Sequence, residues 1–186
     1  MARISFDEVE NYRGEGGNLD FFKLKNHQDV KRVRFMYEKE EDIVAYVVHR
    51  VEINGKSRNV ECIRSYDEPM SKCPLCESGS PQLVKFYIPL YDIDAKKAVI
   101  WERGKTFQKK LTSLTRRYNP LVAQVIEIER NGEAGDQKTT YETFVVTEEG
   151  EDSVRLKDLP PVPEPDAILL SKNAEEMRKF IATGVF

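Results

Sequence analysis

Residues 43–76, IVAYVVHRVEINGKSRNVECIRSYDEPMSKCPLC, hold the four side chains that decide the fold of this chain. His49, Cys62, Cys73 and Cys76 follow the spacing His-x12-Cys-x10-Cys-x2-Cys and include all three cysteines of the 186 residues. Three thiolates and one imidazole are a standard ligand set for a four-coordinate structural zinc ion. A lone Cys-x2-Cys pair would be weak evidence, but the fourfold set predicts one structural zinc site.

The residues around His49 predict a strand hairpin. Residues 43–53 alternate so that His49 shares a face with aliphatic side chains, and Asn54-Gly55 is a strong turn signal before a returning strand over 58–65. A buried imidazole needs partners for its nitrogens, and a metal supplies one. The alternative is a core histidine hydrogen-bonded to a carbonyl group.

The rest of the chain predicts mostly strands. Further strands are expected over 30–37, 85–93, 98–103, 123–130 and 140–147, with helices within 107–118 and near 174–181. This order favours a mainly β fold, an antiparallel barrel of the OB type with an inserted zinc-binding subdomain and one or two short helices. The expected parts are an irregular arm (1–22), the OB-type core (23–150) with its zinc subdomain (about 49–80), and a proline-rich linker with a short helix (151–186).

Composition favours a cytoplasmic protein with a polyanionic ligand. Three cysteines cannot form a disulfide framework, and no apolar leader or membrane-length segment is visible. The net charge of −3 hides a segregation, because basic residues are in excess over 23–118 and acidic residues at both ends. A basic centre suggests a polyanion as ligand, and uneven surface charge without function is the alternative.

Strand faces opposite the expected core carry cations and aromatic rings. Cations can follow phosphates while flat rings stack on unpaired bases, which is how proteins hold single-stranded nucleic acid with little sequence preference. Ordinary half-buried strand residues are the alternative for any single aromatic. The predicted contact residues are Arg32, Arg34, Tyr46, Arg50, Lys85, Tyr87, Tyr91, Trp101 and Arg103.

With these motifs the chain resembles the single-stranded DNA-binding proteins of T-even phages and their relatives. The resemblance covers roughly residues 28–147. Its most specific part is the His49–Cys76 ligand spacing, and it includes VKRVRF (30–35), WERGK (101–105), the helix over 107–114 and the strand over 123–130. It implies an OB-fold core, His49, Cys62, Cys73 and Cys76 as zinc ligands, and DNA-contacting aromatics at Trp101 and around Tyr87.

The resemblance also implies a non-enzymatic role in phage DNA replication, recombination and repair, in the host cytoplasm. That family starts with a basic segment for cooperative self-association and ends in an acidic tail that recruits replication partners. Here residues 1–22 are acidic, and the concentrated acids lie at 148–166. Self-association on DNA and recruitment of replication or recombination proteins through the acidic region are therefore expectations.

Two other functions fit parts of the pattern. A zinc-ribbon adaptor would bind protein rather than DNA, with the basic centre facing an acidic partner. A thiol oxidoreductase would use Cys73-Pro-Leu-Cys76, but such motifs place the first cysteine at the start of a helix, and Glu77-Ser-Gly-Ser-Pro81 does not continue one. No other catalytic constellation is visible, so we expect a protein that is not an enzyme.

Overall fold

The computed structural model of this protein describes residues 20–39, 42–136, 138–146, 159–161 and 169–186. The strands are β1 (Val30–Phe35), β2 (Ala45–Ile53), β3 (Lys56–Glu61), β4 (Gln82–Asp92), β5 (Lys97–Gly104), β6 (Val125–Asn131) and β7 (Thr140–Val146). The α-helices are α1 (Pro74–Glu77), α2 (Gln108–Arg117) and α3 (Ala174–Thr183), and 3-10 turns occupy η3 (Met70–Lys72), η4 (Lys105–Phe107) and η5 (Leu121–Ala123).

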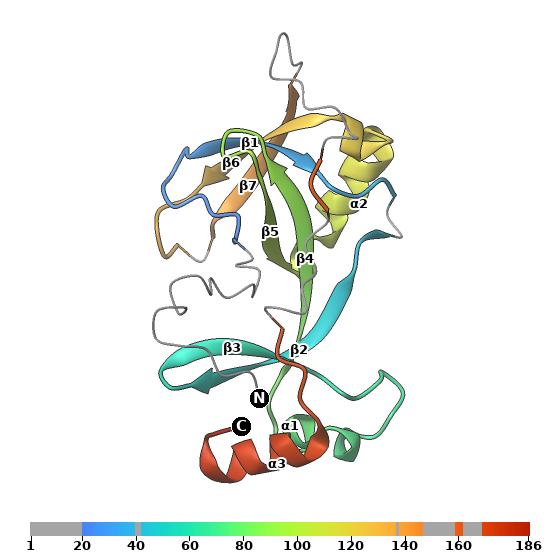
Figure 1. The fold of residues 1–186 in the computed structure, drawn as a ribbon, viewed down its shortest axis with the longest axis vertical. Coiled ribbons are helices and arrows are strands. Elements are labelled where there is room, and N and C mark those ends of the chain that lie inside the picture. Colours follow the sequence, from blue (N-terminus) through green and yellow to red (C-terminus); the bar gives the residue numbers. More distant parts are fainter. Residues whose placement is uncertain (1–19, 40–41, 137, 147–158, 162–168) are drawn as a thin grey trace, which may run out of the picture.

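The long strand β4 joins the two halves of the molecule. Residues 82–86 pair with β2, residues 90–92 with β1, and residues 85–92 with β5, all antiparallel. Figure 1 shows β4 running from the upper part, where β1, β5, β6, β7 and α2 lie, down to the β2–β3 hairpin, α1 and α3. The strand order is β3-β2-β4-β1-β6-β7, with β5 paired to β4. The predicted mainly β, antiparallel class is therefore confirmed.

The sheet is not closed by backbone pairing among the described residues. β5 pairs with β4 and β7 pairs with β6, and no ladder joins β5 to β7. Side chains connect these two strands instead: the rings of Trp101 and Tyr141 lie 5.5 Å apart, and the Arg103 guanidinium lies 3.8 Å from the Tyr141 ring centroid. The curled sheet thus brings β5 and β7 together, but the predicted OB-type barrel is not confirmed.

Both faces of the central strands are covered, which changes which side chains are exposed. Val99, Ile100 and Trp101 are consecutive in β5, and each is at most 2% exposed. Trp101 packs edge-on against Phe22 and Phe107 in the main core, to which α2 contributes Leu111 and Leu114. Strands buried on both faces do not follow the half-exposed alternation that the sequence analysis assumes.

The described N-terminal residues belong to the sheet. The backbone N–H of Phe22 donates to the carbonyl of Ile100 (2.8 Å), whose own N–H donates to the carbonyl of Asp20 (2.9 Å). Phe22 and Leu24 are buried in the main core. Of the expected irregular arm 1–22, residues 1–19 lie outside the described residues, whereas residues 20–22 pair with β5.

The C-terminal residues pack against the lower half. Leu170 forms a parallel bridge with Val60, and its carbonyl accepts the N–H of Glu61 (3.0 Å). The predicted helix is confirmed as α3, which begins with a capping box between Asn173 and Glu176 and ends at Gly184 with φ 73°. Most of the expected proline-rich linker lies outside the described residues.

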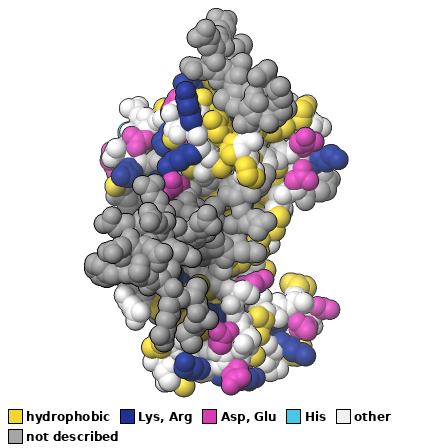
Figure 2. Space-filling view, in the orientation of Figure 1, with side chains coloured by type: hydrophobic (Ala, Val, Ile, Leu, Met, Phe, Trp, Pro, Cys, Tyr) yellow, Lys and Arg dark blue, Asp and Glu magenta, His cyan; other side chains and the backbone are white. Residues whose placement is uncertain are grey.

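The surface mixes charges of both signs with apolar side chains. Figure 2 shows this mixture on one face. In the part of the chain that the structure describes, no helix combines the length and apolar character needed to cross a membrane.

Replacement of Trp101 tests this burial. Because its ring fills the core between β5, α2 and β7, we expect Trp101→Ala to lower the free energy of unfolding by about 3–5 kcal/mol. Urea unfolding followed by circular dichroism measures the change, with the exposed Phe144→Ala as control. A loss below about 1 kcal/mol for Trp101→Ala would place the ring at the surface.

Candidate metal centre and adjoining groove

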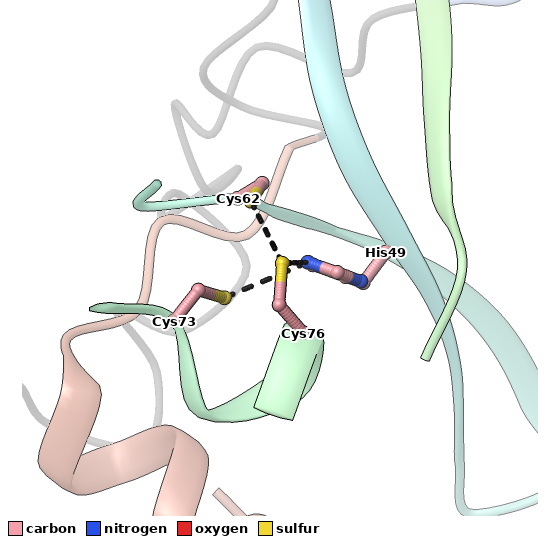
Figure 3. Close-up of side chains that lie close together, drawn as sticks. All are labelled: His49, Cys62, Cys73 and Cys76. Atoms are coloured by element: carbon pink, nitrogen blue, oxygen red, sulfur yellow. Dashed lines mark hydrogen bonds between the residues drawn. The ribbon is translucent and has the colours of Figure 1, made fainter. Parts of the chain in front are cut away.

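Local structure brings the four predicted ligands together. His49 lies on β2, opposite Val60 of β3, and Asn54 and Gly55 close the hairpin with positive φ angles of 51° and 71°. Cys62 follows the end of β3, and its N–H donates to the carbonyl of Val47 (2.9 Å). Figure 3 shows these two residues facing Cys73 and Cys76, which lie just before and within α1.

The distances among the donor atoms fit one metal ion. His49 Nε2 lies 3.5 Å from the sulfur atoms of Cys73 and Cys76, and the sulfur atoms of Cys62 and Cys76 are 3.6 Å apart. All four donor atoms lie within 4.8 Å of one another. Tetrahedral bonds of about 2.3 Å to sulfur and 2.0–2.1 Å to nitrogen separate neighbouring donors by roughly 3.5–3.8 Å. The four residues therefore lie close enough to bind one metal ion, as predicted.

Neighbouring polar groups orient the donors. His49 Nδ1 lies 3.2 Å from Ser80 Oγ. With the proton on Nδ1, the ring donates to this hydroxyl and keeps its Nε2 lone pair for a metal. Gln82 Nε2 donates to the Cys62 sulfur at 3.1 Å, and Arg64 holds the Gln82 amide oxygen at 2.9 Å. Such outer contacts fix ligand orientation and stabilise a thiolate.

Helix α3 shields the centre from solvent. His49 and Cys73 are fully buried, and Cys76 is 2% exposed. Met177 of α3 is also fully buried, with its sulfur 3.9 Å from the Cys73 sulfur. A closed site with four protein donors and no open position has the form of a structural metal site rather than a catalytic one.

The protonation states of the metal-free donors follow from burial. Burial lowers the pKa of His49, so its imidazole is neutral near pH 7 and can act as a ligand. Burial, together with the neighbouring Cys62 and Cys73 thiols, raises the pKa of Cys76 to about 12. Burial opposes ionisation of Cys73 as well, but backbone N–H groups, first that of Cys76, lower its pKa. A metal must therefore displace at least the Cys76 proton.

The predicted exposure at the sheet surface is wrong for four of the nine side chains expected to contact DNA. Arg34, Tyr87, Tyr91 and Trp101 are buried, with at most 7% exposure each. Arg34 donates to the carbonyl of Ala123 at 3.0 Å, so its guanidinium stabilises the chain after α2. Little of their surface is accessible, although Trp101 and Tyr87 each line one of the hollows described below, and the DNA-contact roles of all four stay predictions.

The other five predicted residues reach the surface. Arg50 is exposed, and Arg32, Tyr46, Lys85 and Arg103 are half-buried. Ion pairs join Arg32 to Asp94 (2.7 Å) and Lys85 to Glu102 (2.6 Å). Their roles as DNA contacts stay predictions.

A groove that runs from the upper sheet to the β2–β3 hairpin collects aromatic and basic side chains. Three adjoining hollows have volumes of about 390, 340 and 110 Å³. The first and second are both lined by Arg103 and Tyr141. The second and third are both lined by Phe21 and Glu102. We call this surface the basic-aromatic groove. Its principal side chains are Phe21, Lys23, Lys25, Arg50, Arg58, Trp101, Glu102, Arg103, Phe107, Lys110, Arg130 and Tyr141.

Sequence reasoning missed two aromatic members of this groove. Phe21 is 37% exposed and lies in the segment expected to be irregular. Tyr141 lies on a correctly predicted strand, β7, and its alternation with Thr140 and Glu142 offered a signal for one face. Only the curl of the sheet shows that this face meets Arg103 of β5.

Comparisons with known proteins give no identification. No family model matches the chain, and no curated protein matches it.

Removing a metal ligand tests the centre. We expect about one metal ion per chain and, for Cys73→Ser, a loss of at least about 3 kcal/mol in the free energy of unfolding, because the ion closes the loop between β3 and α1. Elemental analysis and thermal melting measure both effects, with the exposed Glu77→Gln as control. Unchanged melting of Cys73→Ser would argue against a structural metal.

Metal binding should also depend on pH. Because the Cys76 thiol keeps its proton in the metal-free protein over this range, metal binding must release that proton, and a lower proton concentration favours the release, so metal affinity should increase from about pH 6 to about pH 8. Calorimetry in two buffers with different ionisation enthalpies counts the released protons. A pH-independent affinity without proton release would show that the thiols are not the ligands.

Proposed function

We propose that this protein binds single-stranded DNA with little sequence preference. It protects and organises exposed strands during phage DNA replication, recombination and repair, and it carries one structural zinc ion on His49, Cys62, Cys73 and Cys76. The observation that carries the proposal is the basic-aromatic groove, one end of which is lined by the same β2–β3 hairpin that brings His49 to the three cysteines.

The chemistry of the groove suits an unpaired strand. Phe21 and Tyr141 offer ring surface at which bases can stack, each stack worth about 1–3 kcal/mol and tolerant of base identity. Arg50 and Arg58 supply positive charge at one end of the groove and Lys110 at the other. Stacking needs bases that are not already paired, so this combination favours single strands over duplexes.

Zinc fits the centre because its donors, three thiols and one imidazole within 4.8 Å of one another, are the N/S ligands that zinc binds in tetrahedral structural sites. Its role would be mechanical. The ion ties Cys62, at the end of β3, to His49 on β2, and the same hairpin carries Arg50 and Arg58 into the groove. A metal at this point stabilises one wall of the proposed DNA site without taking part in any reaction.

The remaining partners belong to the same proposal. The protein acts as a binding protein rather than an enzyme, in the cytoplasm of the host cell, and it self-associates along the strand. The acidic stretch over 148–166, most of which lies outside the described residues, recruits replication or recombination proteins.

Titration with oligothymidine tests the function. Fluorescence anisotropy should show binding that weakens steeply with salt, because phosphate contacts release counterions, and weaker binding to a duplex of equal length. Tyr141→Ala and Phe21→Ala should each reduce affinity by about 1–3 kcal/mol, roughly 5- to 150-fold.

Phe144→Ala is the matched control. Phe144 is an exposed aromatic on the same strand as Tyr141, but an odd number of residues away, so it lies on the opposite face of the sheet. Its loss should leave DNA affinity unchanged. Equal affinity for duplex and single strand would contradict the proposal, and absence of any DNA binding would favour the zinc-ribbon adaptor.

A further inference from the structure

One face of helix α2 carries only cations and polar hydroxyls. Lys109, Thr112, Ser113, Arg116 and Arg117 occupy positions i, i+3, i+4, i+7 and i+8, so they form one continuous stripe along the helix. They line a shared hollow of about 470 Å³. The buried residues Leu111, Leu114 and Thr115 hold other faces of α2 against the protein. We call the five residues the α2 stripe.

The positive charge of the α2 stripe is not offset by ion pairs within the described part of the chain. The helix sequence QKKLTSLTRR contains no acidic residue. Among the ion pairs of the described residues, the one on α2 is Lys110 with Glu142, and none includes Lys109, Arg116 or Arg117. Like charges along one helix face repel one another, and a bound polyanion removes that cost.

Helix stability explains only part of this pattern. Arg116 and Arg117 lie in the last turn, where the helix dipole favours cations. Lys109 lies in the first turn, where the same dipole disfavours a cation, and that turn has no acidic residue. Helix stability therefore does not explain the cation at Lys109, whereas a role in binding an anionic ligand does.

The α2 stripe starts beside the proposed DNA site. Lys110 lines the basic-aromatic groove, where it donates to the carbonyl of Tyr141 and pairs with Glu142 at 3.3 Å. Lys109 precedes it, and successive residues of a helix point about 100° apart. One face of α2 thus borders the groove, and the neighbouring face carries the stripe away from it over about 12 Å, at roughly 1.5 Å per residue.

We propose that the α2 stripe binds the phosphates of single-stranded DNA beyond the groove and so lengthens the strand that one molecule occupies. This inference rests on the proposed function. Lysine, arginine, serine and threonine are the usual side chains for phosphate oxygens, and they carry no base information. An acidic polypeptide is disfavoured as the ligand because the stripe holds no apolar or aromatic anchor, on which protein interfaces depend.

The test compares oligothymidines of increasing length with a neutral triple variant, Lys109→Gln, Arg116→Gln and Arg117→Gln. For long oligothymidines we expect the variant to lose about 2 in the slope of log affinity against log salt, since each single-strand phosphate contact contributes about 0.7. At about 0.1 M salt this corresponds to affinity weaker by up to roughly a hundredfold. The shortest oligothymidine that binds should show no change.

The matched control is the triple variant Lys72→Gln, Arg178→Gln and Lys179→Gln, which removes the same charge from exposed positions on η3 and α3, in the lower half of the molecule. It should keep the wild-type slope, and both variants should melt like the wild type. An equal loss at every length, or no loss at any length, would overturn the inference while the proposed function stands. Absence of wild-type binding to every oligothymidine would overturn both, and poly-glutamate binding that the α2 variant loses would make the stripe a protein-binding surface.

Discussion

The cluster of three sulfur atoms and one imidazole nitrogen within 4.8 Å of one another is the constraint on which the lower half of the molecule depends. These four donors join β2, the end of β3 and α1, and Met177 of α3 closes over them. The elements are short: α1 has four residues and β3 has six. Elements of this size bury little apolar surface, so an ion bound at these donors would supply stabilisation that packing alone does not.

Strand β4 links this centre to the rest of the molecule. Its first residues pair with β2, which carries His49, and its later residues pair with β1 and β5 in the main core. Arg50 and Arg58 on the β2–β3 hairpin and Arg103 and Tyr141 on the upper sheet consequently line one groove. The hairpin that holds His49 therefore also forms one wall of the proposed DNA site.

Much of the fold follows from local sequence signals. The Asn54-Gly55 turn, the strands and the capped helix α3 occur as predicted, because turn chemistry, alternation and capping act between residues close in the chain. The exposure of the central aromatics could not be predicted in this way. The alternation of side chains along a strand puts Trp101 and Ile100 on opposite faces of β5. Because both faces are covered, both side chains are buried, and the prediction that Trp101 is exposed is wrong.

By itself the sequence determined the candidate ligand set of the metal centre. Cys62, Cys73 and Cys76 are all the cysteines of the chain, and His49 is the histidine at a suitable spacing from them. Three thiolates and one imidazole are a standard set for zinc. Only the tertiary structure decided that Phe21 and Tyr141 join Arg103 in a groove, and that α3 covers the metal centre. The groove residues Phe21, Arg103 and Tyr141 lie 38 to 120 positions apart in the chain, and Cys73 and Met177 lie 104 positions apart. These contacts depend on the curl and pairing of the whole sheet. No local pattern encodes such distances.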